Sequence, residues 1–286
     1  MEHFDMESLK NLPDRERIQK INTFVWIGYS LANSILEEFK IMMDTPEKDR
    51  MPGRLLVGDV NNGKTVILKQ FFKLNSPKIV SPSRELHIPV LFFRAFKSDE
   101  KLFYTSILNS IGISYTPQES KFLTLQRTVY LLKKVKVKFI IIDEFQNILS
   151  TGNMNQQRNF LVILKEFSNE MKVPIVLCGT KDAKYAINTD PNVRSRFDEI
   201  ELKSWTRDEE YLRMLMSFEK ILPLRKTSNL HHTDLSNKIL KMSGGTLGFI
   251  KEIIDRAAIL AIRNKTEKIT IETLNQIRFN QNNQSL

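Results

Sequence analysis

Apolar residues follow two different spacings along this chain, and the change between them divides it. In residues 1–45 they recur every three or four positions, which predicts helices with an interruption at WIGY, residues 26–29. Between residues 46 and 205, short apolar runs alternate with segments of helical spacing. We expect strands at RLLVGD, IPVLFFRAF, KFIIIDE, PIVLCGT and DEIELKSW. The helical segments between them are 65–74, 101–111, 119–134, 155–171 and 181–188.

Strands that alternate with helices predict an α/β fold, with a central parallel five-stranded sheet flanked by helices on both faces. KFIIIDE is apolar until its last two residues, as expected of a strand buried on both sides. After Trp205 the strand-like runs stop, and only helical spacing follows. We therefore expect an N-terminal helical extension (1–45), an α/β domain (46–205) and a small all-helical domain (206–286).

The composition changes this picture little. Of the 286 residues, 41% are hydrophobic and 27% charged, which is typical of a folded globular protein. No apolar run reaches the about 18 residues that a membrane span needs, and the N-terminal stretch MEHFDMESLKNLPDRER does not resemble a signal peptide. The single cysteine, Cys178, excludes an internal disulfide. We expect a cytoplasmic protein without a membrane partner.

The charge balance favours a polyanionic partner. The chain has 43 Lys and Arg against 33 Asp and Glu, a formal charge of +10. Each neutralised phosphate releases counterions, so nucleic acid is a natural partner, although solubility alone also explains such a charge. Arg94, Lys97 and Lys101, around the end of the second predicted strand, are candidates for contacts with DNA phosphates. A solvated loop before a helix explains them equally well.

GDVNNGKT, residues 58–65, has the spacing G-x-x-x-x-G-K-T and joins a predicted strand to a predicted helix. In such a loop, backbone N–H groups surround phosphate oxygens and the helix N terminus points at them. The lysine adds a positive charge, and the threonine hydroxyl can ligate Mg²⁺. A polar turn is the alternative, which the flanking strand and helix disfavour. The candidate nucleotide-binding residues here are Gly58, Asp59, Val60, Asn61, Asn62, Gly63, Lys64, Thr65 and Val66.

Two acidic residues, Asp143 and Glu144, end the strand KFIIIDE. The carboxyl ends of parallel strands face the crevice in which ligands bind. We expect Asp143 to hold Mg²⁺ beside Thr65, and Glu144 to orient and deprotonate an attacking water. A strand that simply ends at the surface is the alternative.

Three further polar residues are candidates for catalysis. Thr180 ends the strand PIVLCGT, where its hydroxyl can sense a γ-phosphate or position water, or simply start a turn. Arg194 and Arg196 precede the last strand, in NVRSRFDEIEL. An arginine there can stabilise transition-state charge on the nucleotide of a neighbouring subunit. Surface solvation is the alternative for both arginines.

With these elements in this order, the chain resembles an AAA+ ATPase: a P-loop, a strand ending in Asp-Glu, a polar sensor strand, R-x-R-F and a helical lid. A closer match is to the TniB group of transposition ATPases, which are similar to TnsC and more distantly to MuB. The segments that carry it, between about residues 10 and 270, are LPDRERI, VWIGYSLANSILEEF, KDRMPGRLLVGDVNNGKT, IIIDEFQNIL, VPIVLCGT, TDPNVRSRF and ILPLRKTSNL.

This resemblance implies an ATPase with ATP and Mg²⁺ as cofactors, in the bacterial cytoplasm or nucleoid. It implies assembly into rings or filaments on double-stranded DNA, through contacts with the DNA backbone. It also implies delivery of that DNA to a DDE transposase. By the same resemblance, 46–205 is the nucleotide-binding domain and 206–286 the lid. The implied roles are phosphate and Mg²⁺ binding for Gly58, Gly63, Lys64, Thr65 and Asp143, water activation for Glu144, a sensor role for Thr180, and a finger role for Arg196 or Arg194.

The resemblance also places WIGY, with Ile27 and Tyr29, near the adenine, although aromatic residues more often mean core packing. One departure concerns the lid. Members of the AAA+ class often carry a lid arginine near a glycine turn, whereas this chain has Phe249 and Lys251 after its GGTLG turn. Lys251 is the candidate substitute, and a lid sensor is in doubt.

Two other functions remain open. One is a helicase-loader-like ATPase, similar to DnaC and IstB; the extended N-terminal helices and the separate lid count against a minimal loader. The other is a nucleotide-gated signalling scaffold that binds protein instead of DNA. The scaffold predicts no salt-dependent DNA binding, whereas a protein that contacts DNA phosphates shows a steep salt dependence.

Overall fold

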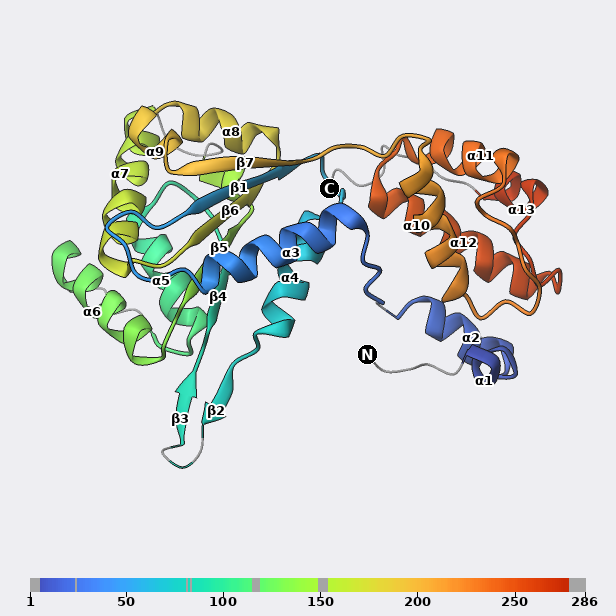
Figure 1. Cartoon of the computed structure of the whole chain (residues 1–286), viewed down its shortest axis with the longest axis horizontal. Coiled ribbons are helices and arrows are strands. Elements are labelled where there is room, and N and C mark those ends of the chain that lie inside the picture. The colour runs from blue at the N-terminus through green and yellow to red at the C-terminus, as the bar shows by residue number, and fades with distance from the viewer. Residues whose placement is uncertain are drawn as a thin grey trace. The chain divides into compact units, whose positions relative to one another are not determined.

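A computed structural model describes residues 6–23, 25–80, 82, 84–114, 119–148 and 154–277 (Figure 1). They fall into two units. Unit 1 takes in the described parts of Met1–Asn33 and Lys203–Leu286 together with Asn61–Gly63. Unit 2 takes in Ser34–Val60 and the described parts of Lys64–Leu202. Among the described residues, no helix is both long enough and apolar enough to cross a bilayer.

The sheet of unit 2 has five strands in the order β4-β5-β6-β1-β7, and all neighbouring strands run parallel. Their bounds are Gly53–Gly58 (β1), Val90–Arg94 (β4), Phe139–Asp143 (β5), Ile175–Gly179 (β6) and Phe197–Leu202 (β7). The predicted central parallel sheet is confirmed. β7 ends at Leu202, three residues before the predicted limit at Trp205.

The described helices of segment 30–202 lie before and between these strands. They are Ser30–Met43 (α3), Lys64–Leu74 (α4), Glu100–Ser110 (α5), Lys121–Lys134 (α6), the 3₁₀ helix Phe145–Ile148 (η1), Met154–Met171 (α7), Lys181–Asn188 (α8) and Pro191–Arg194 (α9). Side-chain caps mark several starts: the carboxylate of Asp99 accepts a hydrogen bond from Leu102 N, and Ser120 Oγ accepts one from Leu123 N. Most helices lie within one or two residues of the predicted ranges.

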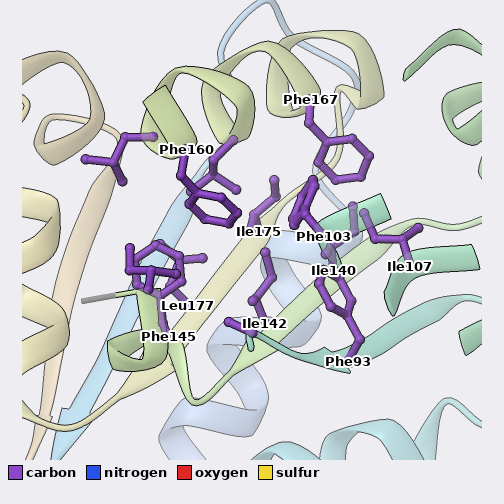
Figure 2. Close-up of a cluster of buried hydrophobic side chains, with 14 of the residues drawn as sticks. Phe93, Phe103, Ile107, Ile140, Ile142, Phe145, Phe160, Phe167, Ile175 and Leu177 are labelled. Atoms are coloured by element: carbon purple, nitrogen blue, oxygen red, sulfur yellow. The ribbon is translucent and has the colours of Figure 1, made fainter. Parts of the chain in front are cut away.

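One face of the sheet carries the larger apolar core of unit 2. Ile140, Ile142 and Leu177 point from β5 and β6 towards aromatic side chains of α5 and α7, as Figure 2 shows. Phe103 is central, because its ring makes edge-on contacts with Phe160 and with others nearby. Such contacts add stability beyond that of apolar burial. This core therefore fixes β5 and β6 relative to each other.

The opposite face of the sheet is covered by α3 and α4 (Figure 1). Phe39 of α3, Phe71 of α4 and Phe139 of β5 form a cluster with ring centroids 4.9 to 5.6 Å apart. Side chains alternate between faces along a strand. Residues 139, 141 and 143 of β5 therefore share the face on which α4 lies.

A two-stranded antiparallel hairpin was not expected from the sequence. It pairs Lys78–Val80 (β2) with Glu85–His87 (β3), between α4 and β4. Its strands have three residues each, too short for the period-two signal to stand out from the surrounding polar residues. Ile79 and Leu86 face each other across the hairpin, and both side chains are exposed.

Unit 1 is all-helical among its described residues. Its helices are Met6–Lys10 (α1), Asp14–Ile21 (α2), Glu209–Lys220 (α10), Thr233–Ser243 (α11), Leu247–Arg263 (α12) and Ile271–Gln276 (α13). α12 is the central helix, because its residues at helical spacing, from Ile250 to Ile262, are buried. Residues 278–286 of the predicted lid lie outside the described residues. The predicted boundaries after residues 45 and 205 stay predictions.

A buried ion pair joins the N-terminal helix α2 to the chain before α13. Both guanidinium NH groups of Arg17 donate to the carboxylate of Glu267, at 2.7 and 2.8 Å, and the Arg17 side chain is fully buried. Arg17 also donates to Asp14, which pairs with Lys265 as well. The hydrogen bonds from Lys265 and Arg17 lower the pKa of Asp14 to about 2, and Arg17 lowers the pKa of Glu267.

Replacing Arg17 with methionine should lower the free energy of unfolding by about 3 kcal/mol, because the buried carboxylate of Glu267 loses both guanidinium hydrogen bonds and keeps only its longer contacts with Arg225. Urea unfolding measures this loss. The matched control is Arg213→Met, which removes an exposed pair with Glu209 and should cost less than about 1 kcal/mol. Carboxylates with lowered pKa values stabilise the folded state at neutral pH, and this stabilisation is lost as the pH falls through those values. Equal losses in the two variants would contradict the prediction.

Candidate nucleotide-binding site

The loop between β1 and α4 has the conformation of a phosphate-binding loop. β1 ends at Gly58 and α4 begins at Lys64. Asn61 and Gly63 have φ values of 61° and 87°, in the left-handed region, so the loop turns sharply before the helix. Alternation of backbone handedness is what directs successive N–H groups into a concave anion site. The loop is also closely packed at its start, since a Cβ on Gly58 would lie 2.8 Å from the carbonyl oxygen of Leu202.

The Lys64 side chain lies along this loop. Its Nζ donates to the carbonyl oxygens of Gly58 and Asp59, at 2.8 and 2.7 Å, and the residue is 8% exposed. Burial lowers the pKa of the Lys64 ammonium, and the nearby carboxylates of Asp143 and Glu144 oppose that shift. The ammonium is therefore held within the loop by weak backbone acceptors, which phosphate oxygens can replace with stronger, charged ones.

Asp143 meets Thr65 because of the two-residue repeat of β5. Asp143 shares a face with Phe139, which packs on α4, whereas Ile140 and Ile142 point into the other core. Thr65 lies in the first turn of α4. Its Oγ1 donates to Asp143 Oδ2 at 2.9 Å, and Asp143 is 1% exposed.

A hydroxyl and one carboxylate suit Mg²⁺ bound together with a nucleotide. Mg²⁺ prefers oxygen donors, and proteins usually hold it through one or two carboxylates plus substrate phosphates. Nowhere in the described ranges do three or more His, Cys, Asp or Glu side chains form a group that could hold a metal by themselves. The residues Lys64, Thr65 and Asp143 therefore fit a Mg²⁺–nucleotide complex, with the phosphates completing the metal's ligands.

Glu144 leaves the sheet at a strained position. Its φ is 56°, which is uncommon for a non-glycine residue, and its backbone N donates to Asp143 Oδ1 at 2.9 Å. Such strain persists where the surroundings hold the residue in place and is common at functional sites. The half-buried carboxylate accepts a hydrogen bond from Gln146 Nε2 at 2.6 Å.

Thr180 follows β6, the strand next to β5, and is the residue before α8. Its backbone N donates to Gln146 Oε1 at 3.1 Å, whereas its Oγ1 makes only a long contact of 3.5 Å with Asp182. Gln146 therefore connects Glu144 with the end of β6. The sequence analysis did not single out Gln146; its position two residues after the acidic pair was the only available signal.

Arg194 and Arg196 lie before β7 in different environments. Arg194 ends α9 and is exposed. Arg196 is half-buried and donates to Asn169 Oδ1 at 2.9 Å. Burial and the nearby Arg50 lower the pKa of Arg196. Both arginines therefore lie apart from the contacts around Thr65 and Asp143 described above.

Six predicted nucleotide-binding positions belong to unit 1, and four of them besides Asn61 and Gly63 are described here within that unit. Ile27 packs at the edge of its core, and the ring of Tyr29 meets that of Trp205 edge-on at 5.0 Å. Burial, with a contribution from Glu210, raises the pKa of Tyr29 to about 12. Lys251 pairs with Asp255 one turn later on α12, so its charge is already matched. Asn62 is buried, with its side chain bonded to the backbone of Lys203 and Leu247.

The candidate DNA-contacting residues lie at and after the carboxyl end of β4. Arg94 is its last residue, Lys97 is in the following loop and Lys101 is in the first turn of α5; all three are exposed. Phe96, between them, is 60% exposed, which the sequence analysis did not point out. An exposed aromatic side chain among cations is compatible with a nucleic-acid surface.

The family model for bacterial TniB proteins matches residues 17–207. The chain belongs to the TniB family. The matched range contains the P-loop, the acidic pair, Thr180 and both candidate arginines of this TniB protein. The resemblance stated from the sequence is thereby confirmed. No curated protein matches the chain.

Solved structures share the fold of this TniB protein at low sequence identity. Cdc6p of Pyrobaculum aerophilum has a TM-score of 0.61 and 17% identity, over 89% of this chain and 68% of that one. The Aeropyrum pernix ORC1 protein in complex with DNA gives 0.59 and 14%, over 90% and 67%. Drosophila ORC bound to DNA gives 0.58 and 11%, over 96% and 67%. The TniB chain thus spans about two thirds of each. These matches confirm the predicted AAA+ fold with its helical C-terminal part.

Proposed function

We propose that this TniB protein is a Mg²⁺-dependent ATPase that assembles on double-stranded DNA and recruits or activates a DDE transposase. In this proposal residues 46–205 form the nucleotide-binding domain, 206–286 the lid and 1–45 an N-terminal extension. The protein acts in the bacterial cytoplasm or nucleoid.

The observation that carries the nucleotide part is the 2.9 Å hydrogen bond between Thr65 and Asp143, next to the buried ammonium of Lys64. It places one hydroxyl, one carboxylate and one cation at the N terminus of α4. This set supplies the donors that Mg²⁺ and nucleotide phosphates need. When bound, Mg²⁺ would neutralise charge that develops on the phosphate oxygens.

Residues of the chain bind the phosphates, activate the water and sense the terminal phosphate. The loop from Gly58 to Thr65 binds and orients the phosphates through backbone N–H groups. Glu144 orients a water and takes up its proton at the carboxylate. Thr180, at the end of the neighbouring strand, senses the terminal phosphate. Hydrolysis then depends on a correctly placed Glu144.

DNA is the proposed template for assembly. The formal charge of +10 favours a polyanion, and Arg94, Lys97 and Lys101 are exposed cations after one strand. Two of the structural neighbours, the Aeropyrum pernix ORC1 protein and Drosophila ORC, are complexes with DNA. Contacts with phosphates carry little sequence information, which suits a protein that marks target DNA of varied sequence.

An arginine finger acting between subunits makes turnover depend on assembly. The loss of Arg194 or Arg196, whichever is the finger, should leave ATP binding intact and reduce DNA-stimulated turnover at least about tenfold, as one lost contact to a charged group would. Steady-state phosphate release of Arg194→Ala and Arg196→Ala, with and without duplex DNA, measures this effect.

Mixing two inactive variants is the control for a finger that acts between subunits. Lys64→Ala protein lacks a working P-loop but keeps its arginines, so adding it to the finger variant should restore part of the turnover. Parental turnover in both arginine variants would exclude a finger at either position. Turnover per subunit that is independent of DNA and of protein concentration would mean a self-contained ATPase, as expected of the signalling scaffold.

A further inference from the structure

We infer that Gln146 is a positioning residue that holds Glu144 against the end of β6, and so links the proposed base to the Thr180 segment. This inference rests on the proposed function. Gln146 lies on η1, two residues after Glu144 and 34 residues before Thr180, and its amide contacts both. All three residues belong to unit 2.

The two hydrogen bonds define the orientation of the amide. A backbone N–H can only donate, so the group at 3.1 Å from Thr180 N must be the amide oxygen of Gln146. The amide nitrogen then faces the Glu144 carboxylate, which can only accept when ionised. Glutamine alone among residues of this length both accepts from the backbone and donates to the carboxylate. A glutamate would repel Glu144, and a methionine would form neither bond.

Gly179 is the second observation that points to this link. A Cβ on Gly179 would lie 2.5 Å from Gln146 Oε1 and 2.8 Å from the Cβ of Ala183. The last residue of β6 therefore needs to be glycine for the Gln146 side chain to lie against the strand end. Gln146 N would lie 3.3 Å from the same Cβ, so the backbone of η1 as well as the amide lies close to the end of β6.

The consequence is a mechanical connection across two strand ends. Glu144 follows β5, and Thr180 follows β6, the neighbouring strand. Thr180 is the residue proposed to sense the terminal phosphate. A shift of its backbone moves the amide oxygen of Gln146, which accepts the hydrogen bond from Thr180 N. The amide nitrogen of Gln146, which donates to Glu144, then moves as well and changes the position of the Glu144 carboxylate. Water activation thereby becomes sensitive to what Thr180 contacts.

The first test uses the nucleotide-free protein and needs no activity. In ¹⁵N-labelled protein, Gln146→Met should speed hydrogen exchange of the Thr180 amide by about tenfold, because its acceptor is lost. Glu144→Ala should shift the Gln146 side-chain NH₂ resonance and leave the Thr180 amide protected. Unchanged exchange at Thr180 in Gln146→Met would overturn the inference.

The second test separates positioning from folding. Gln146→Met should lower kcat about tenfold and leave KM for ATP within about twofold, because the base is displaced and the phosphate loop is not. The matched control is Gln126→Met, the same change at an exposed position on α6, with parental kcat expected. Gln146→Glu can still accept from Thr180 N but repels Glu144, so it should keep the Thr180 amide protected and lose turnover.

A double-mutant cycle assigns the effect to Glu144. In the Glu144→Gln background, Gln146→Met should cause no further loss of turnover, whereas a purely structural role would lower it again. Parental turnover in Glu144→Gln would show that Glu144 is not the base. A loss in Glu144→Gln together with parental kcat in Gln146→Met would overturn this inference and leave the proposed function standing.

Discussion

Replacing Lys64 with alanine is expected to abolish ATP binding at the concentrations that saturate the parent protein, with an affinity about 10²- to 10³-fold lower. The ammonium is buried in the loop and donates hydrogen bonds to the carbonyl oxygens of Gly58 and Asp59. Phosphate oxygens would give it charged partners in a site partly removed from water. Loss of one partner of such a desolvated, hydrogen-bonded charge pair costs several kcal/mol, about 2 to 5.

Calorimetric titration with ATP and Mg²⁺ measures this loss. The matched control is Lys69→Ala, which removes an exposed lysine from the same helix and should bind ATP like the parent. Because assembly is proposed to need ATP, Lys64→Ala should also fail to assemble on DNA. If Lys64→Ala binds ATP as tightly as the parent protein, the loop of residues 58–65 is not the nucleotide-binding site.

Replacing Glu144 with glutamine is expected to lower phosphate release by about 10²-fold or more, the scale of a lost general base. The glutamine keeps the shape of the side chain and can still accept the hydrogen bond from Gln146. Binding should therefore persist, because Lys64, Thr65 and Asp143 are untouched. The variant should form longer-lived complexes with DNA than the parent does, since the ATP-bound state no longer decays.

Single-turnover phosphate release and ATP affinity, measured on the same preparation, separate the two effects. Glu170→Gln makes the same change at an exposed position near the end of α7 and should release phosphate at the parental rate. Should Glu144→Gln release phosphate as fast as the parent, another residue would have to activate the water.

The sequence was sufficient to predict the sheet and to place Asp143 beside Thr65. Strand and helix periodicities differ, so KFIIIDE could be recognised as a buried strand and GDVNNGKT as the loop before a helix. The two-residue repeat then places Asp143 on the α4 side of β5, where the 2.9 Å contact with Thr65 is found. These features depend on local order along the chain, which a single sequence contains.

Other features depend on contacts between distant segments, which periodicity does not encode. Gln146 reaches Thr180 only because β5 and β6 are neighbours and residue 179 lacks a side chain. The ion pair of Arg17 with Glu267 joins positions 250 residues apart. The strands β2 and β3 have three residues each, too few for the alternation of apolar and polar residues that would predict a strand. The roles of all the candidate residues in nucleotide binding, DNA binding and catalysis stay predictions.

The central claim, ATP-dependent assembly on duplex DNA, is tested most directly by electron microscopy of the protein with duplex DNA and a non-hydrolysable ATP analogue. We expect rings or filaments on the DNA with the analogue, and bare DNA without nucleotide or with Lys64→Ala protein. Raising the salt concentration should remove the assemblies, because phosphate contacts release counterions. DNA that stays bare with the analogue at low salt, or that is coated equally without nucleotide, would contradict the claim.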